Sequence, residues 1–208
     1  MTRGCDDQPA SGAPATARRP ARWAAAGAMT LALALAPGAG AATPPVAGLA
    51  AGPEQVRAAL QGHTLRALDG RTLALGSLRG QVVVINLWAS WCGPCRKELP
   101  RLDALNAELA KSGGRVVAVS IDTNADNARR FVTTHKLKLP VAQDGPDGLA
   151  RALDLQHVPC TVVLDRDGSI ACAVGGGDDA ALAQVTSVAL RLSGRAPVAA
   201  SGGGTETR

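Results

Sequence analysis

The chain has 208 residues, enough for one globular domain with extensions at its ends. Hydrophobic residues make up 46% of the chain and aromatic residues only 2%, so we expect a packed core that contains few aromatic rings. The formal net charge of +5 is modest, and Lys and Arg do not cluster with aromatic residues, so nothing in the sequence favours a nucleic-acid-binding protein.

The N-terminal region has the pattern of an export signal. Basic residues precede a weakly apolar stretch at residues 23–36, and small residues follow that stretch. This order predicts a secretory signal peptide over residues 1–41, with cleavage after Ala41 or Ala42. The apolar stretch is rich in alanine and short for a transmembrane helix, and an uncleaved N-terminal anchor is the alternative.

Composition divides the rest of the chain into three parts. We expect residues 42–59 to form a flexible spacer, residues 60–192 the folded domain, and residues 193–208 a disordered tail. Export would place the domain in an oxidising compartment. There, structural thiols pair, and a redox-active pair stays oxidised unless something reduces it.

The periodicity of the domain predicts a mixed α/β fold. Two turn signals, Asp69-Gly70 and the run 165–168, predict β-hairpins, and the apolar run 82–88 predicts a strand buried on both faces. In chain order, the predicted strands are 64–68, 71–75, 82–88, 116–121, one near Val141, 161–164 and 169–174. The predicted helices are one that has Pro94 near its start and ends at Gly113-Gly114, then 124–135, 149–153 and 178–192. This order indicates a central sheet with helices on both faces.

A W-C-G-P-C block, Trp91 to Cys95, stands between the predicted buried strand and a predicted helix. Two cysteines separated by two residues at the start of a helix can close a small disulfide and reopen it. The first thiol lies where unpaired N–H groups and the helix dipole favour negative charge, and a thiolate is the nucleophile of disulfide exchange. The motif therefore predicts a redox centre.

A structural zinc site is the other common use of C-x-x-C, but such a site needs a second pair of ligands. The remaining cysteines and histidines form no second pair with ligand spacing; they are Cys5, Cys160, Cys172, His63, His135 and His157. We therefore expect no metal and no cofactor.

With these motifs, the chain resembles the exported TlpA/ResA-like thiol–disulfide oxidoreductases of the thioredoxin superfamily. The resemblance covers roughly residues 60–192 and is carried by Leu68-Asp69-Gly70, Leu78-Arg79-Gly80, the run 84–100 that contains W-C-G-P-C and ends in R-K-E-L-P, Val158-Pro159, and the run 163–168. It implies a thioredoxin fold with an N-terminal β-hairpin and a βα insertion after the first helix, at about residues 116–135. It also implies a periplasmic or membrane-facing reductase, often one that serves cytochrome c maturation.

The resemblance assigns roles to the residues at matching positions. Cys92 is the attacking thiolate and Cys95 resolves the mixed disulfide. Pro159 is the family's cis-proline, which packs against the disulfide and presents backbone to a substrate. The expected substrate-binding residues are Trp91, Gly93, Pro94 and Val158.

Asn86 stands where cytosolic thioredoxins, which resemble this stretch, carry a buried aspartate. An amide cannot accept the proton released as Cys95 becomes a nucleophile. Glu98, three residues after Cys95 and on nearly the same helix face, is the next candidate for that role. The alternative interpretation of Glu98 is an ordinary solvated acid in the first turn of a helix.

Several residues near the motif keep two interpretations. Trp88 either shields the disulfide or packs in the core, and His157 is either a perturbing or metal-binding group or a loop residue without a role. Cys160 follows the proline where the family usually has threonine or serine. A two-residue hairpin loop would place Cys160 and Cys172 on opposite sheet faces. A three-residue loop would place both on one face and permit a strained bridge. The alternative interpretation is two buried cysteines that pack as small apolar residues.

We therefore predict an exported protein-disulfide reductase that acts as a monomer on disulfide-bearing envelope proteins, with apocytochrome c as one candidate. A membrane thiol–disulfide protein would supply its electrons. The Gly-Pro dipeptide between the cysteines resembles reducing members of the family. The alternatives are a disulfide oxidant or isomerase of the same fold, and a copper-binding assembly chaperone using Cys92, Cys95 and a histidine, although such chaperones usually show C-x-x-x-C.

Overall fold

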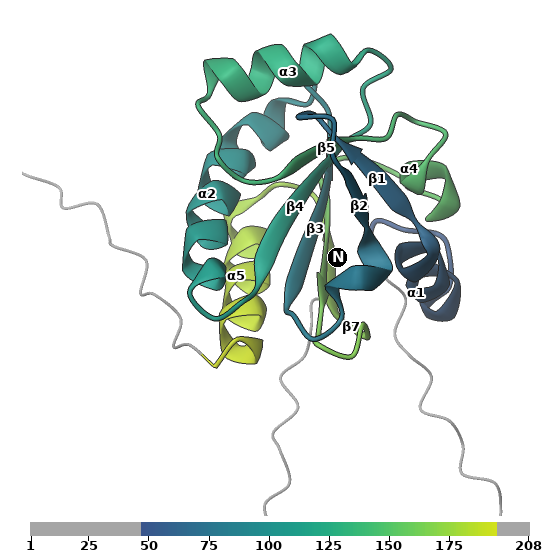
Figure 1. The fold of residues 1–208 in the computed structure, drawn as a ribbon, viewed down its shortest axis with the longest axis vertical. Coiled ribbons are helices and arrows are strands. Elements are labelled where there is room, and N and C mark those ends of the chain that lie inside the picture. Colours follow the sequence, from purple (N-terminus) through teal and green to yellow (C-terminus); the bar gives the residue numbers. More distant parts are fainter. Residues whose placement is uncertain (1–46, 195–208) are drawn as a thin grey trace, which may run out of the picture. The chain divides into compact units, whose positions relative to one another are not determined.

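The computed structural model describes residues 47–194, so the predicted signal and most of the predicted tail lie outside the described residues. One seven-stranded mixed sheet has the strand order β2-β1-β5-β4-β3-β6-β7 (Figure 1). The strands are β1 (Thr64–Ala67), β2 (Thr72–Ala74), β3 (Val83–Trp88), β4 (Arg115–Ser120), β5 (Val141–Gln143), β6 (Cys160–Leu164) and β7 (Ile170–Gly175). The helices are α1 (Pro53–Gly62), the short 3-10 helix η1 (Leu75–Leu78), α2 (Gly93–Ala110), α3 (Ala125–Thr134), α4 (Leu149–Ala152) and α5 (Asp179–Leu192).

Strand β3 is central to the sheet and leads into the W-C-G-P-C block. All of its residues are buried, as its continuous apolar sequence predicts. It pairs in parallel with β4 and antiparallel with β6. Because β3 ends at Trp88 and α2 begins at Gly93, the two cysteines lie at the step from the middle of the sheet into a helix.

Helices cover both faces of the sheet (Figure 1). On one face, α2, α3 and α5 enclose a core that contains Val84 and Trp88 of β3. On the other face, α1, η1 and α4 enclose a second core that contains Ile85 and Leu87. Successive side chains of one strand point to opposite faces, so β3 contributes to both cores. The predicted α/β architecture is confirmed.

The N-terminal hairpin forms as predicted, with β1 antiparallel to β2. Strand β5 joins this hairpin to the rest of the sheet, because it pairs antiparallel with β1 and parallel with β4. Strand β4 itself lies inside the sheet, between β3 and β5. The predicted insertion, at about residues 116–135, covers β4 and α3. In the structure, the inserted pair that extends the sheet is α3 with β5.

The predicted flexible spacer, residues 42–59, is wrong over its second half. Helix α1 starts at Pro53, where a missing N–H costs no hydrogen bond, and buries Val56 and Leu60, which lie one helical turn apart. Upstream of it, Leu49 is buried and forms a β-bridge with Leu155. The folded domain therefore includes Leu49 and does not begin at residue 60.

The hairpin between β6 and β7 has a three-residue loop. The N–H of Asp165 donates to the carbonyl oxygen of Ser169 at 2.9 Å, and Gly168 adopts a φ of 82°. A β-bulge follows, since Leu164 pairs with Ile170 but Val163 pairs with Cys172.

This bulge decides where the two remaining cysteines point. The extra residue reverses the face of every later side chain in β7. Cys172 consequently lies in the core beneath α2 and α5, whereas Cys160, on β6, lies in the core beneath α1 and α4. Cys160 is a free thiol, so the bridge to Cys172 that a three-residue loop alone would permit does not form.

Within residues 47–194, no helix has both the length and the apolar character that crossing a bilayer requires.

Candidate active site

Cys92 and Cys95 form a disulfide at the N-terminus of α2, with an S–S distance of 2.05 Å and a Cα–Cα distance of 5.3 Å. Cys92 is the N-cap residue, and its Sγ accepts a hydrogen bond from the N–H of Cys95 at 3.2 Å. That N–H and the helix dipole would stabilise negative charge on the Cys92 sulfur after reduction. The local sequence thus places the first cysteine where a thiolate is favoured.

The two cysteines differ slightly in exposure. Cys95 is completely buried, whereas Cys92 keeps 5% of its surface exposed. Beside it, Trp91 is 66% exposed and is the one large hydrophobic residue that lies exposed among residues 47–194. Cys92 is therefore the more exposed of the two cysteines and lies beside an exposed indole.

Pro159 is buried and lies close to Pro94 of the motif. The Val158–Pro159 peptide bond is cis, as the resemblance implies. A Cβ on Gly177 would lie 2.8 Å from Cβ of Pro94 and 2.9 Å from Cγ of Pro159, so all three residues meet at one point. Only a residue without a side chain fits there. Sequence reasoning did not single out Gly177, although the run of three glycines at the end of β7 was a visible signal.

Glu98 is buried, with 3% of its surface exposed, so the interpretation as a solvated first-turn acid is wrong. Burial raises the pKa of Glu98 from 4.5 to about 7. The Thr161 hydroxyl, the Asn86 amide and the positive charge of Arg101 lower that pKa, but by less. A carboxyl group with a pKa near neutrality can take up or release a proton at physiological pH.

A short chain of hydrogen bonds leads to Glu98 from the sheet. Asn86 Nδ2 donates to Thr161 Oγ1 at 2.8 Å, and Thr161 Oγ1 donates to Glu98 Oε1 at 3.1 Å. The other carboxylate oxygen, Oε2, is buried without a hydrogen-bond partner. Sequence reasoning missed Thr161, because its partners are 75 and 63 residues away in the chain.

A second buried carboxylate holds the loop before the cysteines. Asp122 follows β4, and its Oδ2 accepts a hydrogen bond from the Ser90 backbone N–H at 3.0 Å while its Oδ1 accepts one from Ser90 Oγ at 2.8 Å. Ser120 Oγ donates a further bond to Asp122 Oδ2 at 2.8 Å. These bonds fix the backbone two residues before Cys92. Asp122 is a third site residue that the sequence did not reveal, after Gly177 and Thr161.

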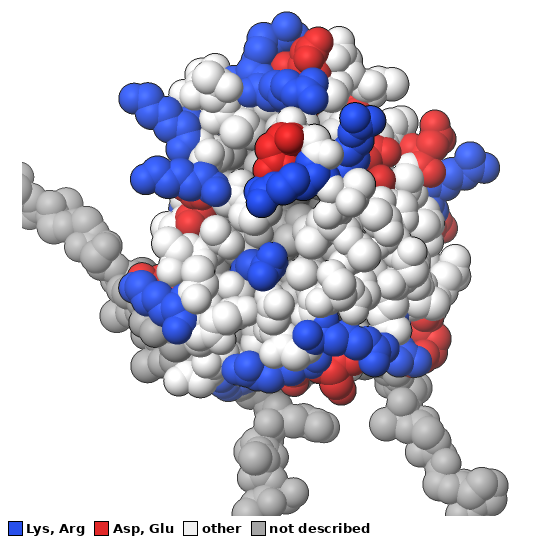
Figure 2. Space-filling model, viewed as in Figure 1, with Lys and Arg blue, Asp and Glu red and all other residues white. Residues whose placement is uncertain are grey.

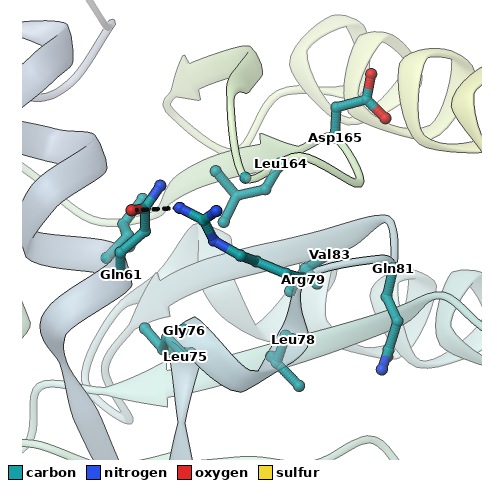
Figure 3. A pocket seen from close by; sticks show the side chains of 11 residues that line it. Gln61, Leu75, Gly76, Leu78, Arg79, Gln81, Val83, Leu164 and Asp165 are labelled. Atoms are coloured by element: carbon teal, nitrogen blue, oxygen red, sulfur yellow. Dashed lines mark hydrogen bonds between the residues drawn. The ribbon is translucent and has the colours of Figure 1, made fainter.

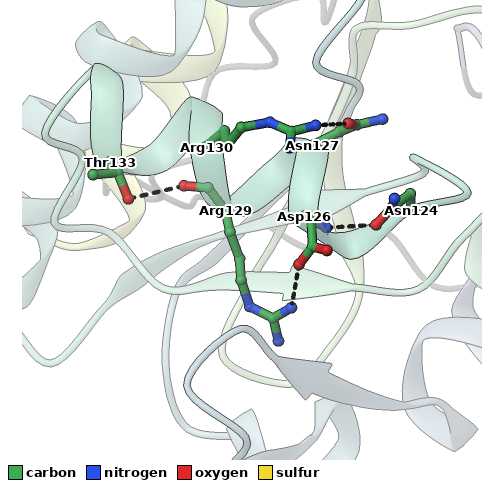
Figure 4. A network of polar contacts seen from close by, with 6 residues as sticks. All are labelled: Asn124, Asp126, Asn127, Arg129, Arg130 and Thr133. Carbon is green, nitrogen blue, oxygen red and sulfur yellow. Dashed lines mark hydrogen bonds and ion pairs between the residues drawn. The ribbon is translucent and has the colours of Figure 1, made fainter.

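Trp88 packs in the core rather than lining the surface. It is fully buried, and its ring lies 4.9 Å from the ring of Phe131 on α3. Phe131 in turn stacks on His135 at 4.2 Å. Helix α3 is therefore attached to the active-site region through aromatic contacts, and its outer face carries the polar contacts of Figure 4.

Cys160 is buried on the far side of the sheet from α2. Burial, with the negative charge of Glu98, raises the pKa of the Cys160 thiol to about 12. A thiol of that kind holds its proton and reacts slowly. His157, the nearby histidine, is exposed and lies against Gly175.

The metal-ligating side chains of the described residues form no cluster, and charges of both signs are mixed on the face that Figure 2 shows. Among residues 47–194, no group of three or more His, Cys, Asp and Glu side chains could hold a metal ion. On the face shown in Figure 2, many Lys and Arg side chains lie beside Asp or Glu, and exposed ion pairs such as Arg129–Asp126 contribute little to stability.

A pocket lies at the other end of β3, away from the disulfide (Figure 3). It is lined by residues of α1, η1 and the β6–β7 hairpin, and Arg79 Nη2 donates to Gln61 Oε1 there at 2.8 Å. None of the predicted site residues lines this pocket.

A family model described as the AhpC/TSA family matches residues 56–173. The chain belongs to the AhpC/TSA family. A curated relative of this AhpC/TSA-family chain is the thiol-disulfide oxidoreductase ResA of Bacillus cereus, 30% identical over 103 residues. The alignment covers 50% of this chain and 60% of that relative, so the chain spans less than two thirds of the relative's length.

Two solved structures share the fold of this AhpC/TSA-family chain. A secreted thiol-disulfide isomerase of Corynebacterium glutamicum is 31% identical, with a TM-score of 0.57, over 65% of this chain and 86% of that one. A Chlorobium tepidum protein assigned as a thiol:disulfide interchange protein DsbE is 27% identical, with a TM-score of 0.59, over 63% and 92%. The predicted thioredoxin fold and the predicted resemblance to ResA-like oxidoreductases are confirmed.

Proposed function

We propose that this chain is an exported thiol–disulfide oxidoreductase that reduces disulfide bonds of proteins in the cell envelope. One observation carries the proposal: the Cys92–Cys95 disulfide caps the N-terminus of α2, with Cys92 outermost. The names of the relatives, ResA and DsbE, support the same reaction class.

The reaction transfers two electrons from the Cys92–Cys95 dithiol to a client disulfide. The Cys92 thiolate attacks one client sulfur, an S–S bond forms between protein and client, and the client's other sulfur leaves as a thiolate. Cys95 then loses its proton and attacks Cys92 Sγ. The Cys92–Cys95 disulfide forms, and the client leaves with both of its sulfurs reduced.

Glu98 is the proposed acceptor of the Cys95 proton. Both residues are buried on α2, three positions apart and therefore on nearly the same face of the helix. A carboxylate whose pKa is about 7 can accept a thiol proton and return it to solvent afterwards. Asn86, which lies on β3 in the same buried cluster as Glu98, cannot do so because an amide does not accept a proton at physiological pH.

The proposed substrate surface surrounds Cys92. The exposed residues Trp91, Gly93 and Pro94 form one side of it, and the half-buried Val158, next to Pro159, forms the other. A client strand that lies between these sides would bring its disulfide to Cys92 while the backbone at Pro159 contacts it.

The cellular setting rests on the N-terminal pattern and on the relatives. Residues 1–41 have the order of an export signal or anchor, and the Corynebacterium glutamicum structure is of a secreted protein. In a periplasmic or other envelope compartment the pair would be driven towards the disulfide. A membrane dithiol donor would therefore return electrons to Cys92 and Cys95, and envelope proteins such as apocytochrome c would receive them.

Electron transfer to a model client tests this function. The fully reduced chain, mixed with a small disulfide-bonded protein such as insulin, should lose both thiols of the motif as the same number of client thiols appears. Alkylation of free thiols followed by mass spectrometry of the Cys92–Cys95 peptide measures both sides of the exchange. If the client gains no thiols while the motif stays reduced, the proposed function is wrong.

An isomerase of the same fold is the second candidate, because one solved relative carries that name. An isomerase rearranges disulfides without net electron transfer, so the thiol balance of the same experiment separates the two. The copper-chaperone alternative is tested by titrating the reduced chain with cuprous ion. If the chain is a reductase, its affinity for cuprous ion should not exceed that of an unrelated dithiol.

A further inference from the structure

Three buried polar side chains from separate elements meet beneath the active-site helix. Asn86 lies on β3, Thr161 on the neighbouring strand β6, and Glu98 on α2 above them. All three are buried, at 3% exposure or less. Asn86 and Thr161 are direct partners in the antiparallel pairing of β3 with β6, so the sheet fixes their relative position.

The hydrogen bonds among them run in one direction. An amide NH₂ group only donates, so Thr161 Oγ1 must accept the bond from Asn86 Nδ2. The single hydrogen of the hydroxyl is then available for Glu98, whose Oε1 lies 3.1 Å away. Glu98 Oε1 is thus engaged by a donor. Its Oε2 and the Asn86 Oδ1 atom are buried without partners.

We propose that Thr161 is a positioning residue for Glu98: its hydroxyl, oriented by the Asn86 amide, holds Oε1 and leaves Oε2 as the oxygen that takes up the proton. The inference rests on the proposed function, since it assigns the atom that receives the proton of Cys95. Thr161 itself touches neither sulfur of the motif in any hydrogen bond and exchanges no proton with the client.

Other charged or titratable groups near Glu98 act differently. On α2, Arg101 lowers the pKa of Glu98 through its charge, but its guanidinium is exposed and paired with Asp179 of α5. On β6, the Cys160 thiol feels the charge of Glu98 and stays protonated. On α2, Cys95 is held in the disulfide. On the sheet, the Asn86 amide of β3 also lowers the pKa of Glu98, but it donates its hydrogen bond to Thr161. Thr161 is therefore the sheet residue whose hydroxyl donates directly to the Glu98 carboxyl.

The test is a titration of the Glu98 carboxyl by carbon NMR in the oxidised full chain, where the disulfide keeps Cys92 and Cys95 from titrating. Thr161→Val has the same shape without the hydroxyl and should raise the pKa of Glu98 by about one to two pH units, because the ionised carboxylate loses a charge-assisted bond. Thr161→Ser keeps the hydroxyl and should restore the wild-type pKa. Thr161→Ala replaces the valine variant if that variant does not fold.

The outcomes are distinct for a structural role and for the proposed function. If Thr161→Val leaves the pKa of Glu98 unchanged, or if serine shifts it as much as valine, Thr161 is only a packing residue and the inference is wrong. If the pKa moves as expected but the wild-type chain transfers no electrons to insulin, the contact is as inferred and the proposed function fails. In an active chain, the valine variant should also shift the pH profile of client reduction to higher pH.

Discussion

Replacing Cys92 by serine should abolish client reduction, with a loss of about 10³-fold or more, as expected when a covalent nucleophile is removed. Replacing Cys95 by serine should instead stop the reaction at the mixed disulfide. The reason is the difference in access: Cys92 reaches the surface and caps the helix, whereas Cys95 is completely buried and can attack only Cys92. Non-reducing electrophoresis and mass spectrometry of the trapped species measure the result.

Cys160→Ser is the matched control for these variants. It removes a buried thiol that lies on the other side of the sheet from α2, so client reduction should stay at the wild-type rate. Turnover that persists in Cys92→Ser would contradict the assignment of the nucleophile. So would a client bound through Cys160 in the Cys95→Ser variant.

Replacing Glu98 by glutamine should lower the rate of client reduction by about 10²-fold near neutral pH, the lower end of what a general acid or base contributes. The amide keeps the shape of the side chain but accepts no proton from Cys95. The wild-type rate should change with an apparent pKa near 7, and the variant should lack that step. A pH series of single-turnover rates at fixed client concentration measures both effects.

The same substitution should change how stability depends on pH. The pKa of Glu98 is about 7 in the folded protein and 4.5 in the unfolded chain. Protonation of this carboxyl therefore favours the folded state of the protein. That stabilisation is present below pH 4.5 and is lost as the pH rises to about 7. The loss amounts to about 3 kcal/mol for a group this deeply buried.

Urea unfolding of the oxidised chain at pH 4 and pH 8 measures this loss. The free energy of unfolding of the wild type should fall by about 3 kcal/mol more over this interval than that of Glu98→Gln, since the other carboxyl groups are common to both. Equal changes in the two proteins would mean that the Glu98 carboxyl is not held in a water-poor environment, and the proton-acceptor role would lose its basis.

The fold was predictable wherever the signal is local. The run 82–88 is apolar and β-branched throughout, and it forms the fully buried β3. Asp69-Gly70 gives a tight hairpin because glycine adopts a positive φ there. In contrast, α1 was not predicted. The proline, glycine and alanine content of its region indicated a flexible spacer, although Val56 and Leu60 have helical spacing.

The faces of β7 could not be predicted from its turn alone. The loop at 166–168 has the three-residue form that one of the two predictions required, yet the bulge opposite Val163 reversed the outcome for Cys172. The position of a bulge depends on how the strand packs on its neighbours. No residue type in this short strand predicts the bulge.

The candidate site shows the same division. Its cysteines, cis-proline and glutamate follow from one motif and one resemblance. Thr161, Asp122 and Gly177 reach the site only through tertiary contacts, with partners on other strands or helices. Their function is visible only once burial and hydrogen bonding are known, because threonine, aspartate and glycine are common residues with many ordinary roles.

The midpoint potential of the Cys92–Cys95 pair tests the central claim most directly. The full chain is equilibrated with glutathione buffers of known potential, free thiols are alkylated, and the oxidised fraction of the peptide that contains both cysteines is measured by mass spectrometry. A reductase that depends on a membrane donor predicts a value near or below about −220 mV. A value near about −120 mV would make the pair an oxidant of client thiols and would contradict the proposed direction of electron flow.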